Sequence, residues 1–452
     1  MTAKLQATPR HNGDSIAPRA PILTRPLILV FLSQFCTLTS FFLLLSVTPL
    51  LATAAGAGSA GAGLVNGALL AGTVVAELVS AAVMRRCANR TVLAVGAVLM
   101  GVPTLALHSG SALGAIAIVS SVRGFGFGLA TVVAGALAAE LVPPERRGEG
   151  FGIFGMVATV PAVVALPLGV WFAEHIGTSA VVAATAVTAL VPLAAFPWLA
   201  GVAGARGRAK RSAIQTGTDS DQQTLSSILR QGGQLRLALI FAASTVGAGV
   251  VVSFLPLAGG ISKNLAAAGL LVQAVTAAVG RWWAGRSGDR KGHARLLTPA
   301  LAVASLALVA LLWPASSVAV IVGMGVFGAG FGIVQNATFA LMIEGAAESG
   351  TGAASALWNL AYDVGYGAGP AAFGLIVSHT GYPAAFVMTG VLMLTAIPAA
   401  RSSASVWPAV SLPRPRGHEC PVDLQRPVRG GVAVAVGDEL CAGRDGQVVV
   451  AD

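Results

Sequence analysis

The chain has 452 residues, of which 55% are hydrophobic and 10% charged, and its mean hydropathy is +0.79. This balance excludes an ordinary soluble globular protein, in which about a quarter of the residues are charged. The net charge of +10 lies mostly in short segments between apolar runs, so it favours contact with anionic lipid headgroups and not with nucleic acid.

Apolar runs recur along the chain at lengths near the roughly 20 residues that cross a bilayer as a helix. The 56 glycines suit close helix packing in lipid, where small side chains let backbones approach. In chain order, the predicted spans cover 27–51, 62–84, 91–108, 113–139, 151–173, 180–203, 236–258, 264–284, 295–313, 317–343, 353–377 and 382–400. We therefore expect an all-α polytopic membrane protein with twelve transmembrane helices.

One long polar interruption divides these spans into six plus six. The expected organisation is a cytoplasmic N-terminal tail at 1–25, a six-helix bundle at 26–204, a cytoplasmic linker at 205–235, a second six-helix bundle at 236–400, and a flexible cytoplasmic tail at 401–452. The N-terminal tail lacks the apolar core of a cleaved signal peptide.

Lys and Arg concentrate in the even-numbered connections, whereas the odd-numbered ones hold only Lys263. By the positive-inside rule, the even-numbered connections and both termini are cytoplasmic, in a multi-pass protein of the cell membrane. The basic residues that carry this argument are Arg85, Arg86, Arg90, Arg146, Arg147, Arg206, Arg208, Lys210, Arg211, Arg286, Arg290, Lys291 and Arg295.

The two halves repeat in sequence. "RGFGFGL" at 123–129 aligns with "FGAGFGI" at 327–333, and "SVTPL" at 46–50 aligns with "SFLPL" at 253–257. Several matches at nearly constant offset indicate a duplication. Parallel six-helix repeats are a transporter architecture, with the substrate site between the repeats near the middle of the membrane.

The stretch "GRSGDRKG" packs three basic residues and one acid between glycines. Its pattern, Gly285-x-x-x-Asp289-Arg290-x-Gly292, resembles the loop motif of the major facilitator superfamily between helices 8 and 9. The first-half copy, which includes Arg85, departs from that motif by Met84 and Cys87, where Asp and Gly are expected.

A second motif of that family is similar to Arg123-Gly124-x-Gly126-x-Gly128, and the resemblance covers about 26–400. Within the superfamily, "RGFGFG", "ELVPPERRG" (140–148) and "ALWNLAYDVGYG" (356–367) resemble the drug and metabolite efflux branches. The helix-5 signature of antiporters is matched in part, by Pro161, Pro167 and Gly169.

The resemblance implies a cytoplasmic gate in which Asp289 and Arg290, with Arg85 in the other half, latch against a helix of the neighbouring half. The alternative is a solvated cluster that only sets topology. "GRSGDRKG" does not have the spacing of a phosphate-binding loop, and no ATP site occurs elsewhere. We therefore expect no cofactor and no metal, and a proton gradient as the source of energy.

Four ionisable residues lie inside the predicted spans, where each is costly unless it is paired or hydrated. These are Glu77, Arg123, Arg281 and Asp363. We expect proton coupling to run through Arg123 and an acid, with Asp363 as first choice and Glu77 as second. In the rival interpretation, Arg123 is a fixed counter-ion for Glu140 or another carboxylate, and the two acids are structural partners.

Polar and aromatic residues on four spans are candidates for substrate binding, although any single amide can instead join helices. These candidates are Gln34, Gln273, Gln335, Asn336, Trp358, Asn359 and Tyr362. The scarcity of charged cavity residues argues against strongly anionic substrates.

The sequence thus predicts a monomeric secondary transporter in a lipid bilayer that works by proton-coupled efflux of a small, largely apolar compound. An importer or a sugar-efflux carrier is the alternative of the same fold, and a non-transporting receptor is a further one. A membrane enzyme would need a catalytic cluster, and the sequence shows none.

Overall fold

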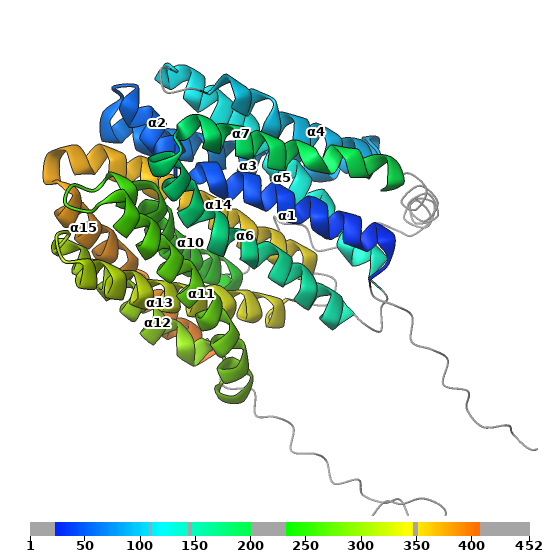
Figure 1. The fold of residues 1–452 in the computed structure, drawn as a ribbon. Coiled ribbons are helices and arrows are strands. Elements are labelled where there is room, and N and C mark those ends of the chain that lie inside the picture. Colours follow the sequence, from blue (N-terminus) through cyan, green and yellow to red (C-terminus); the bar gives the residue numbers. More distant parts are fainter. Residues whose placement is uncertain (1–22, 108–110, 143–146, 200–231, 347–350, 407–452) are drawn as a thin grey trace, which may run out of the picture. The chain divides into compact units, whose positions relative to one another are not determined.

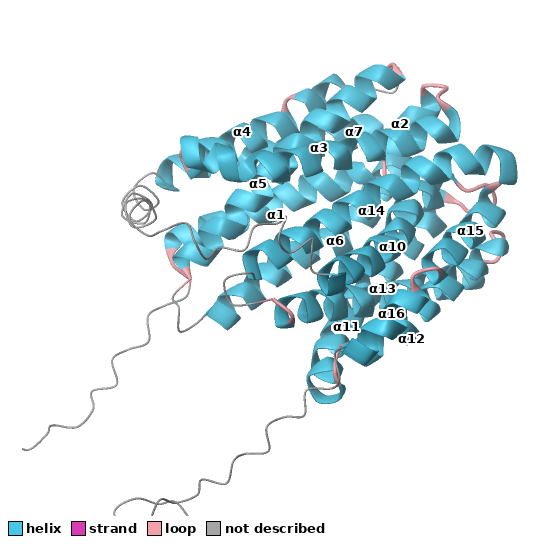
Figure 2. Ribbon diagram, turned by 180° about the vertical axis from the view of Figure 1, so that it is seen from behind, coloured by secondary structure: helices cyan, strands magenta, loops and turns pink. Residues whose placement is uncertain are grey.

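The computed structural model describes residues 23–107, 111–142, 147–199, 232–346 and 351–406. Within these ranges every regular element is a helix, and no strand occurs (Figure 2). The helices follow the predicted spans in order, as the colours of Figure 1 trace along the chain. The all-α polytopic fold class is confirmed.

The first six spans have ends within a few residues of those predicted, and three of them finish in a short second helix. They are α1 (Arg25–Leu45) with α2 (Thr48–Ala54), α3 (Gly58–Arg86), α4 (Asn89–Gly101) with η1 (Pro103–Ala106), α5 (Leu113–Leu141), α6 (Arg147–His175), and α7 (Thr178–Leu190) with η3 (Val191–Leu199).

The second six spans repeat this arrangement. They are α10 (Gly232–Phe254) with η4 (Leu255–Leu257), α11 (Lys263–Lys291), α12 (Ala294–Ala307) with η5 (Leu308–Leu312), α13 (Ser317–Glu344), α14 (Thr351–Thr380), and α15 (Tyr382–Leu394) with α16 (Ile397–Val406). The linker predicted at 205–235 and the tail predicted at 401–452 therefore each lose a few residues to a helix. Their remaining parts, and residues 1–22, lie outside the described residues.

Ten helices in the described ranges are long and apolar enough to cross a membrane, and Thr178–Ala194 is a shorter apolar helix. The helix α14 is long enough at 30 residues but is not among the ten, because its Trp, Asn, Asp and Tyr residues make it less apolar. Together these helices account for the twelve predicted spans. The polar character of α14 marks it as a helix that faces other helices or a cavity.

Both copies of the repeated Ser-x-x-Pro-Leu sequence break a helix. Pro49 has no backbone N–H, so the Leu45 carbonyl four residues earlier loses its helical partner, and α1 gives way to α2. The side-chain amide of Asn66 on α3 donates to that carbonyl at 3.1 Å. In the second half, α10 changes to η4 at Leu255, directly before Pro256.

Two helix pairs make the most extensive contacts between the halves: α3 packs against α14, and α6 packs against α11. Small residues permit the first contact, because a Cβ at Gly63 would overlap the Pro370 carbonyl, and one at Gly374 would overlap the Ser59 carbonyl. We call the end of the bundle at which α3 and α11 finish the basic end, and the end at which α11 begins the opposite end.

Candidate functional site

Two acids from different halves meet at the α3–α14 contact. The carboxyl groups of Glu77 on α3 and Asp363 on α14 are hydrogen-bonded to each other. Asp363 is buried, with 6% of its surface exposed, and Glu77 is half-buried. An ionised carboxylate only accepts hydrogen bonds, so a bond between two carboxyl groups requires a proton on one of them. A hydrogen bond between Glu77 and Asp363 therefore forms only when the pair binds a proton between two helices of different halves.

A basic residue crosses the other contact between the halves. Arg281 on α11 donates from Nη2 to Thr159 Oγ1 on α6 at 3.2 Å. Its guanidinium group also interacts electrostatically with Tyr362, which is adjacent to Asp363 in the chain. We call Glu77, Thr159, Arg281, Tyr362 and Asp363 the interface cluster, because its members come from the four helices α3, α6, α11 and α14, which make the most extensive contacts between the halves.

Arg123 on α5 lies elsewhere. Its side chain is 1% exposed, and it donates from Nε to the Met100 carbonyl at 3.3 Å and from Nη2 to the Ser40 carbonyl at 3.1 Å. Both partners belong to its own half. Among the described residues, no carboxylate pairs with it, and the rival partner Glu140 is about 25 Å further along the same helix. The structure does not bring Arg123 to either predicted acid, so its coupling role stays a prediction.

Aromatic side chains form a ladder along α14, beside the interface cluster. Trp358 stacks on Phe241 of α10 with ring centroids 4.4 Å apart, and Tyr362 stacks on Tyr366 at 5.2 Å. The Trp358 indole N–H donates to Thr338 Oγ1 at 3.2 Å, which fixes the ring. Two predicted substrate residues, Trp358 and Tyr362, therefore belong to one rigid aromatic wall. The third on this helix, Asn359, is exposed and outside the ladder.

The other predicted amides occupy different environments. Gln34 and Gln273 are buried, at 4% and 5% exposed. Gln335 and Asn336 are half-buried. The side-chain oxygens of Gln34 and Asn336 have no hydrogen-bond partner among the described residues. The sequence reasoning missed Asn66, a polar residue in an apolar span, whose amide also donates to Ser253 Oγ in the other half at 2.7 Å.

The predicted gating loop is mostly helical. Helix α11 continues to Lys291, so Gly285, Asp289 and Arg290 lie in its last turns, and Gly292 ends it with φ of 87°. The expectation of a loop from 285 was wrong, because the spans were bounded by hydropathy and α11 continues past its apolar part.

Asp289 contacts His293, a residue of its own half. Its Oδ1 lies 3.9 Å from Nε2 of the buried His293, whose Nδ1 lies 3.1 Å from Oε1 of Glu344. The Asp289 side chain is 78% exposed, and Arg85 and Arg290 are exposed as well. Whether these residues latch against the other half stays a prediction. His293 was missed, since one histidine after a charged run gives no distinctive signal.

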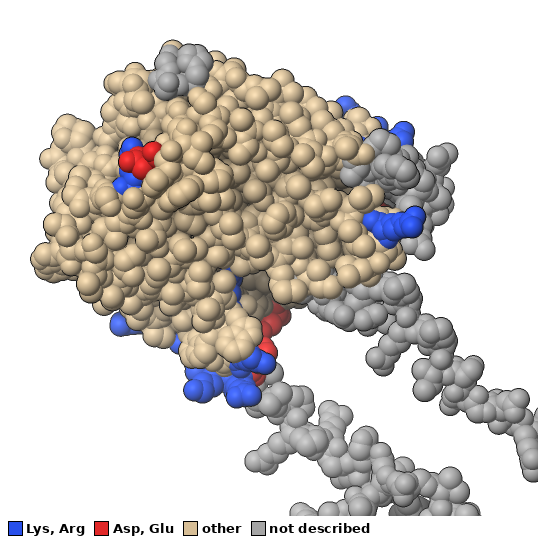
Figure 3. All heavy atoms as spheres, in the orientation of Figure 1, with Lys and Arg blue, Asp and Glu red and all other residues tan. Residues whose placement is uncertain are grey.

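The two ends of the bundle differ in how the halves meet. Towards the opposite end, Ser59 Oγ donates to the Gly374 carbonyl at 3.1 Å, so α3 and α14 are joined there. Figure 3 shows a hollow in the surface near the basic end of α11, with basic and acidic side chains at its edge. A hollow with charged side chains at its edge is open to water and to small molecules.

A family model described as Major Facilitator Superfamily matches residues 30–370. No curated protein matches the chain in sequence. Several solved structures share its fold at low identity. One is a D-xylose–proton symporter, at 15% identity and a TM-score of 0.66, covering 85% of this chain and 97% of that chain.

A second similar structure is a POT family transporter in complex with 5-aminolevulinic acid, at 13% identity and a TM-score of 0.68, covering 84% of this chain and 96% of that one. A third is a bacterial homologue of the human lysosomal transporter Spinster, at 14% identity and a TM-score of 0.66, covering 86% and 98%. Identities at this level establish the fold and not the substrate. Because the family model spans most of the chain, the protein belongs to the major facilitator superfamily and is a secondary transporter, not an enzyme.

Proposed function

We propose that the protein is a proton-coupled exporter of a small, largely apolar organic compound, and that it works by alternating access. The observation that carries the proposal is the meeting of two carboxyl groups, Glu77 and Asp363, at the contact between the halves, where the pair can share a proton. A proton that bridges two halves couples its own binding to their relative position, because any ligand that binds one arrangement better shifts the protein towards it.

Loss of that proton changes the contact between α3 and α14. Two ionised carboxylates repel each other, and the repulsion is strong where little water screens it. Arg281, which reaches from α11 to α6, supplies a positive charge near Tyr362, the chain neighbour of Asp363. It stabilises the ionised acid after release, so the cluster passes between a protonated, joined arrangement and a charged, separated one.

The aromatic ladder suits an apolar substrate. Trp358 and Tyr362 offer ring faces, and the interface cluster supplies the few charges nearby. Such a surface binds a flat or bulky organic molecule through burial of apolar area. Among the described residues, this surface has no cluster of several Arg or Lys side chains of the kind that binds phosphate esters.

Export, and not import, is the direction that the efflux-like motifs favour, with the basic end in the cytoplasm of a cell-membrane protein. The hollow near that end then receives substrate from the cell interior. An importer of the same fold is the alternative, and the sign of substrate movement against an imposed gradient distinguishes the two.

The test compares cells with and without the protein on a panel of toxic apolar compounds, with Asp363→Asn as the inactive control. Lower accumulation in cells with the parental protein, abolished by a protonophore and by Asp363→Asn, supports the proposal. Higher accumulation makes the protein an importer. Transport that persists in the presence of the protonophore contradicts proton coupling.

A further inference from the structure

The opposite end of the bundle is almost free of charge. Its helix ends and connections, at 55–57, 107–112, 174–177, 258–263, 313–316 and 380–382, contain one acid and, apart from two histidines, one basic residue. The acid is Glu174 and the basic residue is Lys263. The remaining Lys and Arg residues are in the spans, the termini or the basic-end connections, so Lys263 is the single exception to their segregation.

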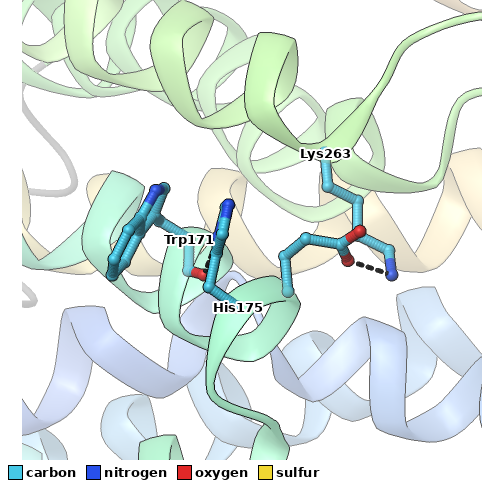
Figure 4. Close-up of polar contacts among 4 residues, drawn as sticks. Trp171, His175 and Lys263 are labelled. Atoms are coloured by element: carbon cyan, nitrogen blue, oxygen red, sulfur yellow. Dashed lines mark hydrogen bonds and ion pairs between the residues drawn. The ribbon is translucent and has the colours of Figure 1, made fainter.

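These two residues form an ion pair between the halves. Lys263 Nζ on α11 lies 2.5 Å from Glu174 Oε2 on α6, and Figure 4 shows the two side chains reaching towards each other from separate helices. Both ends are held in place. Ser262 caps α11 by accepting a hydrogen bond from the Leu265 amide, and His175 stacks on Trp171 in the last turn of α6.

Each of the two charges lies at the helix end where the dipole of its own helix is unfavourable to it. Glu174 is in the last turn of α6, where the helix dipole disfavours an acid, and Lys263 is the first residue of α11, where the dipole disfavours a base. Neither residue therefore stabilises its own helix. Each is favoured at that place by the other, across the contact between the halves.

We infer that the Glu174–Lys263 ion pair is a latch that stabilises the state in which the opposite end is closed, and that it must break each time the halves separate there. The inference rests on the alternating access of the proposed function. The Lys263 side chain is 46% exposed and the Glu174 side chain 38%, so water competes with the pair and its contribution is small, as for other partly exposed pairs. A weak latch suits a carrier that must open in every cycle.

The experiment measures how often the opposite end is open. Spin labels are attached at Leu105→Cys in the first half and Trp313→Cys in the second, both exposed positions near that end, in protein whose four native cysteines are replaced by Ser. Distance distributions are then recorded in lipid vesicles for Glu174→Gln, for Lys263→Gln, and for the charge swap Glu174→Lys with Lys263→Glu. The control is Arg90→Gln, an exposed base at the other end.

Each neutral variant should raise the ratio of open to closed populations about two- to fivefold, which is the range for one partly exposed ion pair. The charge swap should return the ratio to that of the parent, and Arg90→Gln should leave it unchanged. Unchanged distributions in the neutral variants, or a swap that does not restore the parent, overturn the latch while transport continues. One fixed distance in the parent at every pH overturns both the latch and alternating access.

Discussion

Asn66 on α3 donates its side-chain amide to the hydroxyl of Ser253 on α10, 2.7 Å away and in the other half of the protein. The same amide donates to the Leu45 carbonyl at 3.1 Å, which Pro49 leaves without a helical partner. One buried side chain thus completes a broken helix and joins the two repeats at the equivalent Ser-x-x-Pro-Leu position. Its own Oδ1 has no partner among the described residues.

Replacing Asn66 tests this double role. Asn66→Ala leaves a buried carbonyl and a buried hydroxyl without their donor, which costs about 1–3 kcal/mol. We expect a lower unfolding temperature in detergent, whereas Asn264→Ala, at an exposed position of α11, should leave it unchanged. Equal unfolding temperatures for the Asn66 variant and the parent contradict the assigned role.

The orientation of the chain is a second prediction, made from charge alone. A single cysteine at Thr218 in the central linker should resist membrane-impermeant thiol reagents in intact cells, and one at Gly259 should react. Gly259 is exposed and has open space for a side chain. Both variants need the four native cysteines replaced. The reverse labelling pattern would place the basic end outside the cell and contradict the prediction of a cytoplasmic gate.

Asp289→Asn separates a gate from a topology signal. The substitution removes the charge that faces His293 at 3.9 Å but keeps the shape of the side chain. We expect slower transport at normal abundance, because the side chain is 78% exposed and contributes little to stability. Transport at the parental rate shows that the cluster only sets topology.

The sequence allowed the twelve spans to be predicted and singled out Glu77 and Asp363 as acids inside the spans, because apolar length and buried charge are local signals. Helix ends were less well predicted: α11 continues through Gly285 to Lys291, since hydropathy reports the thickness of the bilayer and not the length of a helix. Contacts between residues far apart in the chain could not be predicted from the sequence either. Glu77 and Asp363 were each candidates, but nothing in the chain indicated that their carboxyl groups meet, and Arg123 instead donates to two carbonyls.

The shared proton gives the last prediction. In the proposed mechanism Glu77 and Asp363 bind one proton as a unit, so removing either carboxyl should abolish gradient-driven accumulation in reconstituted vesicles. Groups that act as a unit are not additive, so the double variant Glu77→Gln with Asp363→Asn should be no worse than either single one. An amide at position 363 still donates to Glu77 and keeps the joined arrangement, so substrate binding and passive exchange should persist.

The measurements are proton-driven flux, substrate binding and exchange across the same vesicles, with Glu140→Gln as a carboxyl control away from the cluster. If both single variants lose flux but bind substrate, the pair is the coupling centre. If Glu77→Gln transports normally and Asp363→Asn does not, the proton belongs to Asp363 alone, and Glu77 is its structural partner. Full proton-driven transport by Asp363→Asn removes the pair from the mechanism, and coupling must then run through another group, for which Arg123 remains the first residue to test.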